Sequence, residues 1–428
     1  MRGTLGLYSK YRPIPLWCWR VLIDNEQEED YMKNQVTSVT RNSWGSRIAD
    51  SFMGVIVGII LIPLCLWGLW TNEGTKDVSK LAKMSVVVAS DSVDPSKDGA
   101  FASISGELTS DEQIGDEPYM LPGAYITLDR SAEMYAWKET SQSTETKDTV
   151  GGGSTTTTTY TYSNDWTASP EDSSSFNQPA DHQNPAKTID DASSKAGAAA
   201  IGAYSFDPQA ITLPDGVKID VTPADGLEGF FSSGPYLYNR NGADSAPQVG
   251  DMRISYTALK VGTSVTAMGK LNAGAIESYT DESITQGERT LHRIFIGTRD
   301  EGIAQLRNEF LLWIWAIRIL GVVGLWLGLN LLGGPIVKIL DVVGVVGSIA
   351  GGIWGFISFF VALVVGVTTI IVSMLFHNIY FLIFFVVVVI AGVVYYLRNR
   401  SRKALATGQV PSASNLAGTV NNTAPKMN

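Results

Sequence analysis

The sequence predicts an integral membrane α-helical protein with about four transmembrane helices and one large, mostly β (α+β) extracytoplasmic or lumenal domain. Three observations support this fold class. Residues 52–70 and 310–397 are apolar and nearly free of charge. Residues 71–308 are polar and acidic. Within 71–308, short β-rich stretches alternate with turns rich in Gly, Pro, Asn and Asp. The mean hydropathy of +0.09 hides this segregation because it averages the two kinds of sequence.

The first apolar run, residues 52–70, is the first predicted transmembrane helix. It contains no charged residue, and a helix of this length spans roughly 28 Å, close to the thickness of a hydrocarbon core. Pro63 is tolerable inside a membrane helix. The run begins about fifty residues into the chain and lacks a small-residue cleavage pattern, which favours a retained signal anchor over a signal peptide.

The C-terminal apolar region predicts three further helices. We assign residues 310–332 to the second span, 335–350 to an interfacial or inner connecting segment, 352–376 to the third span and 379–397 to the fourth. The stretch Val342–Phe376 is too long for one straight crossing, and a different division of it yields five spans. We expect the tight connection before the fourth span at His377 and Asn378.

Flanking charges predict the orientation. Arg41 and Arg47 precede the first span, and a cluster of basic residues from Arg398 to Lys403 follows the last. By the positive-inside rule, both flanks are cytoplasmic: an N-terminal segment 1–45, partly disordered, and a basic and then disordered tail 398–428. Two cytoplasmic flanks require an even number of spans, which favours four over five and places 71–308 on the opposite side.

The large domain is acidic and contains no cysteine. It has 18 Lys and Arg against 34 Asp and Glu, a net charge of −16, which argues against nucleic acid as a partner. It must fold without disulfides. The β-rich stretches suggest a mostly antiparallel domain, possibly in two halves, with a long loop at 163–194 and a short helix at Ala192–Ala203. The expected strands are Met84–Ala89, Ala124–Leu128, Met134–Lys138, Thr155–Tyr162, Ile211–Leu213, Val217–Val221, Met252–Leu259 and Ser264–Met268.

Glycines recur at helical spacing in the predicted spans. Positions i, i+4 and i+8 place three glycines on one helix face, where another backbone can approach closely. Such a face suits oligomerisation, and it equally suits packing within one four-helix bundle. The helix-packing candidates are Gly347, Gly351 and Gly355, with Gly54 and Gly58 in the first span and Gly324 and Gly328 in the second.

Arg318 is a candidate intramembrane charge. It lies eight residues into the second predicted span, where an unpaired charge is unfavourable by about 2.5 kcal/mol or more at the bilayer centre. Three interpretations remain open. Arg318 pairs with an acid such as Glu309 or Glu73, binds a lipid headgroup, or extends to the interface with its charge in water.

The sequence contains no recognisable catalytic, cofactor-binding or metal-binding motif. His182, His292 and His377 are far apart and lack metal-ligand spacing. No phosphate-binding loop, dinucleotide fingerprint, zinc-protease motif or nucleophile elbow occurs. We therefore expect no enzyme activity, no catalytic residue, no cofactor and no metal.

Several short strings resemble the transmembrane protein 43 family, also called LUMA. The resemblance covers roughly residues 43–400, and Ala136 departs from it, because the family has Gln at this position. The strings include Ser43–Arg47 with Trp44 and Gly45, then Asn72, Glu73 and Gly74, then Glu133, Met134, Tyr135, Ala136 and Trp137, then Tyr160–Trp166, Asn184 and Pro185, then Gly250, Asp251, Met252 and Arg253, and finally Arg318, Gly321 and Gly328–Asn330.

The resemblance implies an architecture and a setting more than a reaction. Its members have four spans, both termini on the cytoplasmic or nucleoplasmic side and a large lumenal domain. Eukaryotic members are associated with the endoplasmic reticulum and the inner nuclear membrane, with nuclear-envelope organisation and with oligomers. In a bacterium, the corresponding site is the inner membrane with the domain in the periplasm.

The leading hypothesis is a non-enzymatic membrane scaffold. Its expected partners are the lipid bilayer, further copies of the chain as a homo-oligomer and other membrane proteins. An oligomeric ion channel or transporter is the first alternative, although the spans lack a polar face. An extracytoplasmic domain that senses a ligand is the second, and a deep pocket with convergent polar groups would favour it.

Overall fold

The computed structural model describes residues 34–283, 288–342, 344–377 and 379–406. It confirms the predicted fold class: four described helices are long and apolar enough to cross a membrane, and a large, mostly β domain lies between the first helix and the others. The candidate spans are Trp44–Asn72, Arg299–Leu340, Ile349–His377 and Leu382–Asn399. The first 33 residues and the tail after Ala406, for which we expect partial disorder, lie outside the described residues.

The helices begin and end where the local sequence permits. Helix α2 (Trp44–Asn72) starts after Ser43, whose side chain accepts a hydrogen bond from the Ser46 amide, and it continues through Pro63. Helix α4 (Arg299–Leu340) starts with a capping box formed by Thr298 and Glu301. The remaining helices are α3 (Val78–Lys83), α5 (Gly344–His377) and α6 (Ile379–Ala406).

The connection between α4 and α5 falls within the predicted segment 335–350 but is shorter than that segment. Helix α4 runs through Pro335 to Leu340, and α5 begins at Gly344, so most of this segment belongs to the two long helices. The overlong apolar run that the sequence divides is a single helix of 34 residues. Asn378, in the expected connection to the fourth span, lies outside the described residues, between the end of α5 and the start of α6.

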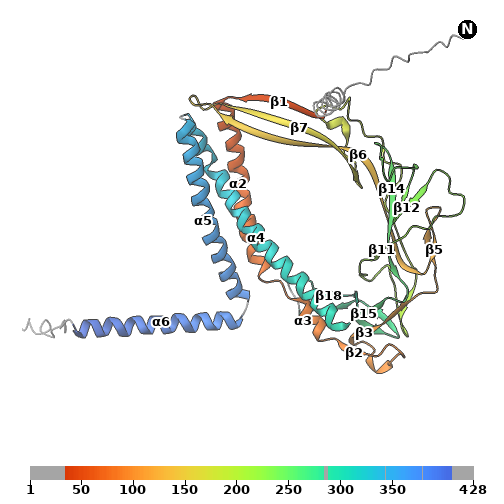
Figure 1. Cartoon of the computed structure of the whole chain (residues 1–428). Coiled ribbons are helices and arrows are strands. Elements are labelled where there is room, and N and C mark those ends of the chain that lie inside the picture. Colours follow the sequence, from red (N-terminus) through yellow and green to blue (C-terminus); the bar gives the residue numbers. More distant parts are fainter. Residues whose placement is uncertain (1–33, 284–287, 343, 378, 407–428) are drawn as a thin grey trace, which may run out of the picture.

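Three helices form the bundle. Helix α2 packs antiparallel to α4, and α5 packs against both (Figure 1). Leu69, Leu325 and Ala362 form its buried centre. Helix α6 leaves the end of α5 at a steep angle (Figure 1), and none of its candidate span is buried. The outward faces of the bundle carry exposed Leu, Ile, Val, Phe and Trp side chains, as expected of a surface in contact with lipid.

The domain contains two main sheets, in agreement with the predicted two halves. The eight-stranded sheet has the order β1-β7-β6-β14-β13-β12, with β8 beside β6 and β11 beside β14. Its strands are β1 (Gln35–Asn42), β6 (Tyr125–Lys147), β7 (Ser154–Thr167), β8 (Ala192–Lys195), β11 (Val217–Ile219), β12 (Phe231–Ser233), β13 (Tyr236–Tyr238) and β14 (Met252–Lys260).

The seven-stranded sheet lies against the first turns of α4 and beside α3. Within this sheet, β3 pairs with β15. Phe295 on β19 packs with Ile303 and Leu306 of α4. Its strands are β2 (Val86–Val88), β3 (Phe101–Thr109), β9 (Ala199–Ile201), β10 (Tyr204–Phe206), β15 (Ser264–Asn272), β16 (Ala275–Glu277) and β19 (Arg293–Ile296).

Short elements complete the domain. Two small two-stranded sheets pair β4 (Ile114–Asp116) with β5 (Met120–Gly123) and β17 (Tyr279–Thr280) with β18 (Thr290–Leu291). Single 3-10 turns occur at η1 (Pro95–Lys97) and η2 (Ser173–Ser175). The helix predicted at Ala192–Ala203 is wrong, because this stretch forms β8 and β9 instead.

The strands β1, β7 and the distal half of β6 form a three-stranded polar ribbon. It returns from the larger sheet to the end of the bundle where α2 begins and α4 ends (Figure 1). Residues 35–42 pair with β7 of the domain in this structure, whereas the sequence predicts a separate cytoplasmic segment 1–45. As a result, the domain contacts both ends of α2.

Candidate functional site

The outer face of the larger sheet carries a row of alternating aromatic and cationic side chains, which we call the cation–π ladder: Trp166, Arg253, Tyr236 and Lys218. The Arg253 guanidinium carbon lies 4.6 Å from the centre of the Trp166 ring and 4.5 Å from that of Tyr236. The Lys218 ammonium lies 4.0 Å from the Tyr236 ring centre. Each such contact attracts the cation to the negative face of the ring.

Strand register explains how these residues come together. In the antiparallel pair β6–β14, Met134 faces Met252 and Glu133 faces Arg253. Because side chains alternate between the two faces of a strand, the methionines enter the core while Glu133 and Arg253 point outward. The Arg253 Nε then donates a hydrogen bond of 2.6 Å to the Glu133 carboxylate.

The ladder and its neighbours resemble the centre of a protein interface in composition. Tyr135 lies beside Trp166, with ring centres 5.4 Å apart. The side chains of Arg253 and Glu133 are 20% and 27% exposed, so they are partly desolvated but reachable. Tyr, Trp and Arg are the residue types most enriched at the energetic centres of protein interfaces.

A loop at residues 168–191 supports this face from one side. The Asn184 side chain accepts a hydrogen bond from the Trp137 amide at 2.7 Å and donates one to the Trp137 carbonyl at 2.9 Å. Its amide group thus makes the two hydrogen bonds that the backbone of a neighbouring strand would make. His182 is buried and stacks on the Tyr162 ring, with ring centres 3.7 Å apart. These contacts hold the polar loop, which the sequence predicts at 163–194, against β6 and β7.

Tyr162, beside this loop, has a strongly raised pKa. Its hydroxyl donates to Glu139 at 2.6 Å and accepts from the Gln178 amide at 2.9 Å. Burial and the hydrogen bond to the Glu139 carboxylate raise the pKa of Tyr162 to about 12. The phenol is therefore neutral at physiological pH and acts as a fixed hydrogen-bond donor.

Gly250 and Asp251 fix the turn that leads into Arg253. Gly250 has a φ of +95°, a region that favours glycine, and a Cβ there would lie 3.0 Å from Pro185. Asp251 accepts two hydrogen bonds from Arg240, at 2.9 and 2.6 Å. Burial raises the pKa of Asp251, but these bonds and one from the Gln248 amide lower it on balance. The turn before Arg253 is thereby fixed.

A second polar cluster lies where α2 ends. The Glu73 carboxylate accepts from the Arg318 Nε and Nη2 atoms at 2.8 and 2.7 Å. Asn72 donates to the Ile314 carbonyl at 3.2 Å. Of the three interpretations of Arg318, the structure supports pairing with Glu73, while Glu309 pairs with Arg293 instead.

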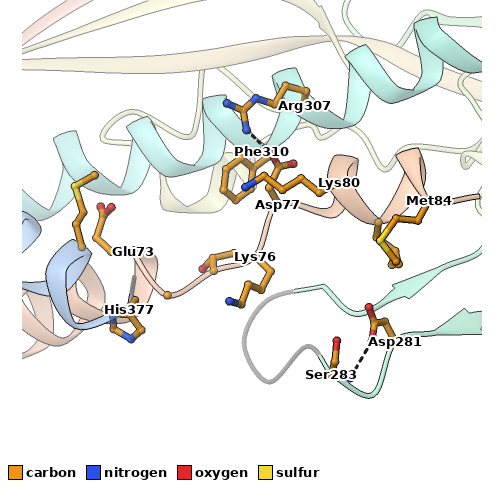
Figure 2. A pocket seen from close by; sticks show the side chains of 14 residues that line it. Glu73, Lys76, Asp77, Lys80, Met84, Asp281, Ser283, Arg307, Phe310 and His377 are labelled. Atoms are coloured by element: carbon orange, nitrogen blue, oxygen red, sulfur yellow. Dashed lines mark hydrogen bonds and ion pairs between the residues drawn. The ribbon is translucent and has the colours of Figure 1, made fainter. Parts of the chain in front are cut away.

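A hollow of about 470 Å³ adjoins this cluster, between the linker from α2 to α3 and the segment around Asp281 (Figure 2). Arg307 on α4 pairs with Asp77 at its upper wall (Figure 2). Asp77 also accepts from the Ser79 amide at 3.0 Å, which caps α3. The α2–α3 linker is thus fixed to α4 at two points.

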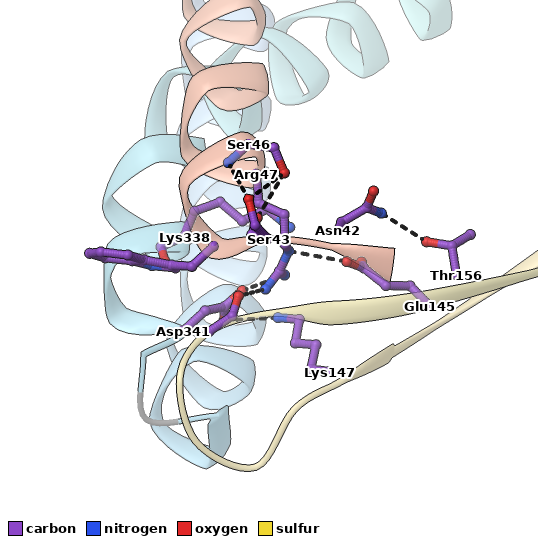
Figure 3. Close-up of polar contacts among 11 residues, drawn as sticks. Asn42, Ser43, Ser46, Arg47, Glu145, Lys147, Thr156, Lys338 and Asp341 are labelled. Carbon is purple, nitrogen blue, oxygen red and sulfur yellow. Dashed lines mark hydrogen bonds and ion pairs between the residues drawn. The ribbon is translucent and has the colours of Figure 1, made fainter. Parts of the chain in front are cut away.

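The third cluster joins the ribbon to the opposite end of the bundle (Figure 3). Asp341 is fully buried and pairs with Arg47 at 2.7 Å and with Lys147 at 2.9 Å. The Trp44 indole donates to the Lys338 carbonyl at 3.0 Å. Gly152 has a φ of +67°, and a Cβ there would overlap the Trp44 ring. We call these contacts the clasp.

The candidate glycines lie at contacts within the chain. A Cβ on Gly58 would lie 2.7 Å from the Gly328 carbonyl oxygen, so α2 and α4 cross at this point with their backbones close together. Gly54 faces Leu331, and Gly324 faces Cys65. On α5, a Cβ on Gly351 would lie 3.3 Å from Val337 of α4, and the carbonyl of Gly355 accepts from the Trp326 indole at 3.0 Å. Gly347 lies against Asp341. The packing within one bundle therefore uses these faces.

The remaining string residues are placed as follows. Gly45 meets open space, and the Gly74 amide donates to the Thr71 carbonyl at 3.1 Å as α2 ends. The three histidines are dispersed: His292 bonds to the Ile276 carbonyl and His377 to the Ser373 carbonyl, while His182 lies in the domain loop. Among the residues that the structure describes, no group of His, Cys, Asp and Glu could hold a metal ion.

Sequence reasoning missed part of each cluster. The strings point to Glu133 and Arg253, but Tyr236 and Lys218 join the ladder only through strand pairing. Alternation in Tyr236-Leu-Tyr238 was an available signal, since it marks a strand with one aromatic face. Asp341 has no local signal, because its partners lie 194 and 294 residues away in the chain.

The fold and these clusters define a multi-pass membrane protein with a large β domain inserted between its first two spans. The family model for Transmembrane protein 43 matches residues 134–379, more than half of the chain, and the chain belongs to this family.

Curated relatives agree with this assignment. The chain is 25% identical to mouse Transmembrane protein 43 over 331 residues, which cover 72% of this chain and 80% of the mouse protein. The human protein is 24% identical over 312 residues, covering 69% and 77% respectively. No solved structure matches the chain.

Proposed function

We propose that this protein is a non-enzymatic multi-pass membrane scaffold that organises membrane protein complexes. The bundle anchors the chain in the bilayer, and the domain binds further copies of the chain and other membrane proteins. In a eukaryotic cell, the proposed site is the endoplasmic reticulum and inner nuclear membrane, with a role in nuclear-envelope organisation. In a bacterium, it is the inner membrane with the domain in the periplasm.

The cation–π ladder carries this proposal. The Arg253 guanidinium carbon lies 4.6 Å from the Trp166 ring centre and 4.5 Å from that of Tyr236, and its Nε bonds to Glu133, so its position is set before any partner arrives. A side chain that is already ordered loses little conformational entropy on binding. A partly exposed Arg between aromatic rings also offers both apolar area and directed hydrogen-bond donors.

The packing of the bundle supports association through the domain rather than through glycine faces. Gly58 and Gly328 are used where α2 crosses α4, and Gly351 is used where α5 meets α4. These positions are therefore occupied by the chain's own helices. The ladder face keeps Arg253 and Glu133 partly exposed, at 20% and 27%, and is the better candidate for a contact between copies.

The test is photo-crosslinking of the full-length protein in native membranes. A photoreactive amino acid at Ser255 places the probe two residues from Arg253 on the same strand face. The matched control is the same probe at the exposed Lys270 of β15, in the other sheet. We expect crosslinked dimers, or crosslinks to another membrane protein, from position 255 and not from position 270.

Native mass measurement in mild detergent gives the stoichiometry. Arg253→Ala should reduce any oligomer, while Lys270→Ala should leave it unchanged. A strictly monomeric protein at membrane-like concentrations, together with no crosslink of either kind from position 255, would contradict the proposal.

A further inference from the structure

The hollow beside the α2–α3 linker lies at the level where the apolar surface of the bundle ends. On α4, Leu312 and Trp313 are 72% and 62% exposed, whereas the preceding turn carries Arg307 and Glu309. Met374 and His377 at the end of α5 line the same hollow. In a membrane, this level corresponds to the lipid headgroup region, because exposed apolar side chains give way to charged ones.

The hollow has two cations that no carboxylate neutralises. Among the described residues, Glu73 pairs with Arg318 and Asp77 pairs with Arg307, which occupies both acids of the linker. Lys76 and Lys80 line the hollow without a carboxylate within ion-pair distance in the described part of the chain. Figure 2 shows Lys76 directed into the space between the linker and the Asp281–Ser283 segment.

Asp281, on the far wall, already has a local partner. Its carboxylate accepts from the Ser283 amide at 2.9 Å, and the hydrogen bonds from Ser283 lower its pKa. The acid therefore stays ionised and turned toward its own loop. Two lysines facing one such acid leave the hollow with a net positive charge, which suits an anion.

Part of the remaining wall is apolar. Phe310, Leu81 and Met374 line the hollow, and Met84 at its edge is 68% exposed. Apolar side chains contribute nothing to the binding of a small soluble anion. A phospholipid, in contrast, combines a phosphate with glycerol and acyl carbons that can contact them. A second hollow of about 430 Å³ lies on the other side of Lys76, between Phe310 and Trp313. Its lining adds the apolar side chains of Val78 and Leu306 and also the carboxylates of Glu288 and Glu309, of which Glu309 pairs with Arg293.

We propose that the hollow is a headgroup site for an anionic phospholipid, in which Lys76 and Lys80 bind the phosphate while Phe310 and Met374 contact the upper acyl chains. The site would hold one lipid where α2, α4, α5 and the domain meet. This inference does not depend on the scaffold proposal, because it concerns a lipid and not a protein partner.

The experiment measures lipid binding to the full-length protein by native mass spectrometry. Protein purified and delipidated in mild detergent is titrated with phosphatidylglycerol and, separately, with phosphatidylcholine. We expect a bound phosphatidylglycerol at concentrations where phosphatidylcholine does not bind. Each lysine near a membrane surface contributes roughly fivefold in affinity for anionic lipid, so Lys76→Gln with Lys80→Gln should weaken binding about twenty-fivefold.

Matched variants separate charge at this site from charge in general. Lys83→Gln removes an exposed lysine from the same short helix that does not line the hollow, and it should leave binding unchanged. The charge-retaining double variant Lys76→Arg with Lys80→Arg should bind as the natural protein does. It also keeps the proposal testable if the glutamine variant fails to fold.

Three outcomes would overturn the proposal. The first is equal binding of the two lipids. The second is a loss on Lys83→Gln as large as the loss on the double glutamine variant, or no loss on the latter while it remains folded. The third is displacement of phosphatidylglycerol by millimolar inorganic phosphate or glycerol phosphate, which would identify the site as one for a soluble phosphate.

Discussion

Glu73, directly after the end of α2, and Arg318 on α4 form a bidentate ion pair. Arg318 lies about two turns into the apolar part of α4. The Arg318 Nε and Nη2 atoms lie 2.8 and 2.7 Å from the two oxygens of Glu73. The Arg318 side chain is 18% exposed and the Glu73 side chain is 4% exposed. This arrangement explains how a guanidinium is accommodated within a candidate membrane span, because its charge is neutralised and two of its donors are satisfied.

Removing one partner of this pair should destabilise the bundle more than removing both. Glu73→Gln leaves a largely buried guanidinium without its counter-charge, a change that is typically unfavourable by about 3 kcal/mol or more. Glu73→Gln with Arg318→Met should recover most of the lost stability. The measurement is the thermal unfolding temperature in detergent. Glu282→Gln, which breaks the exposed pair with Arg289, is the control and should have little effect. Equal losses in the single and double variants would contradict this account.

The crossing of α2 over α4 should be sensitive to a single methyl group. A Cβ on Gly58 would lie 2.7 Å from the Gly328 carbonyl oxygen, closer than van der Waals contact allows, so Gly58→Ala must push the helices apart. We expect a loss of about 1–3 kcal/mol, offset in part by the better helix propensity of alanine. Gly68→Ala on the same helix meets open space and gains the same propensity without the clash. If both variants unfold at the same temperature, the close approach is not present in solution.

The long helices and some of the strands could be predicted from the sequence, because their signals are local, whereas the strand expected at Ile211–Leu213 is only an isolated bridge at Thr212. The segregation of apolar residues locates α2, α4, α5 and α6. The β-rich stretches at 134–138, 155–162 and 252–259 lie within β6, β7 and β14. Each depends only on periodicity and turn residues within about ten positions.

The errors have a common physical cause in long-range contacts. The alanines near position 196 favour a helix by intrinsic propensity, but Ala196 and Ala199 are buried in a closely packed part of the domain where small side chains fit between strands. The pairing of β1 with β7 joins segments more than a hundred residues apart. The ladder likewise requires the register of β6 and β14, which no local pattern specifies.

Alkaline pH should weaken the attachment of the 168–191 loop through Tyr162. Burial and the bond to Glu139 raise the pKa of Tyr162 to about 12, whereas a tyrosine in an unfolded chain has a pKa of about 10. The folded state therefore favours the neutral phenol. Its contribution to stability is fully present below about pH 10 and is lost as the pH rises toward 12. Unfolding curves between pH 9 and about pH 11.5 measure this loss.

The variant Tyr162→Phe should be less stable at neutral pH, because Glu139 loses a hydrogen-bond donor. It should also show a shallower fall in stability above about pH 10 than the natural protein. Tyr160→Phe, two residues away on the same strand, is the control and should retain the steep fall. A Tyr162→Phe protein with an unchanged alkaline profile would show that another group is responsible.

The last prediction concerns the clasp and the orientation of the chain. Val39 on β1 and Thr144 on β6 both face Thr157 on β7, from opposite sides. Facing residues in antiparallel strands have Cα atoms about 4.5–5.5 Å apart, within the range of a disulfide. If α2 crosses a bilayer from end to end, residues 35–42 and the domain lie on opposite sides, because an open polar ribbon cannot pass through hydrocarbon.

Two cysteine pairs in a background with Cys18→Ser and Cys65→Ala test this relationship. Thr144→Cys with Thr157→Cys links two strands of one hairpin and should form a disulfide in detergent and in sealed vesicles alike. Val39→Cys with Thr157→Cys should form one in detergent, where β1 can reach β7, and should fail to do so in sealed vesicles. A disulfide in both media would place residues 35–42 on the same side as the domain. It would overturn the orientation inferred from Arg41 and Arg47 and would make the Lys147–Asp341 pair, which joins the ribbon to the bundle, a feature of the membrane-embedded protein.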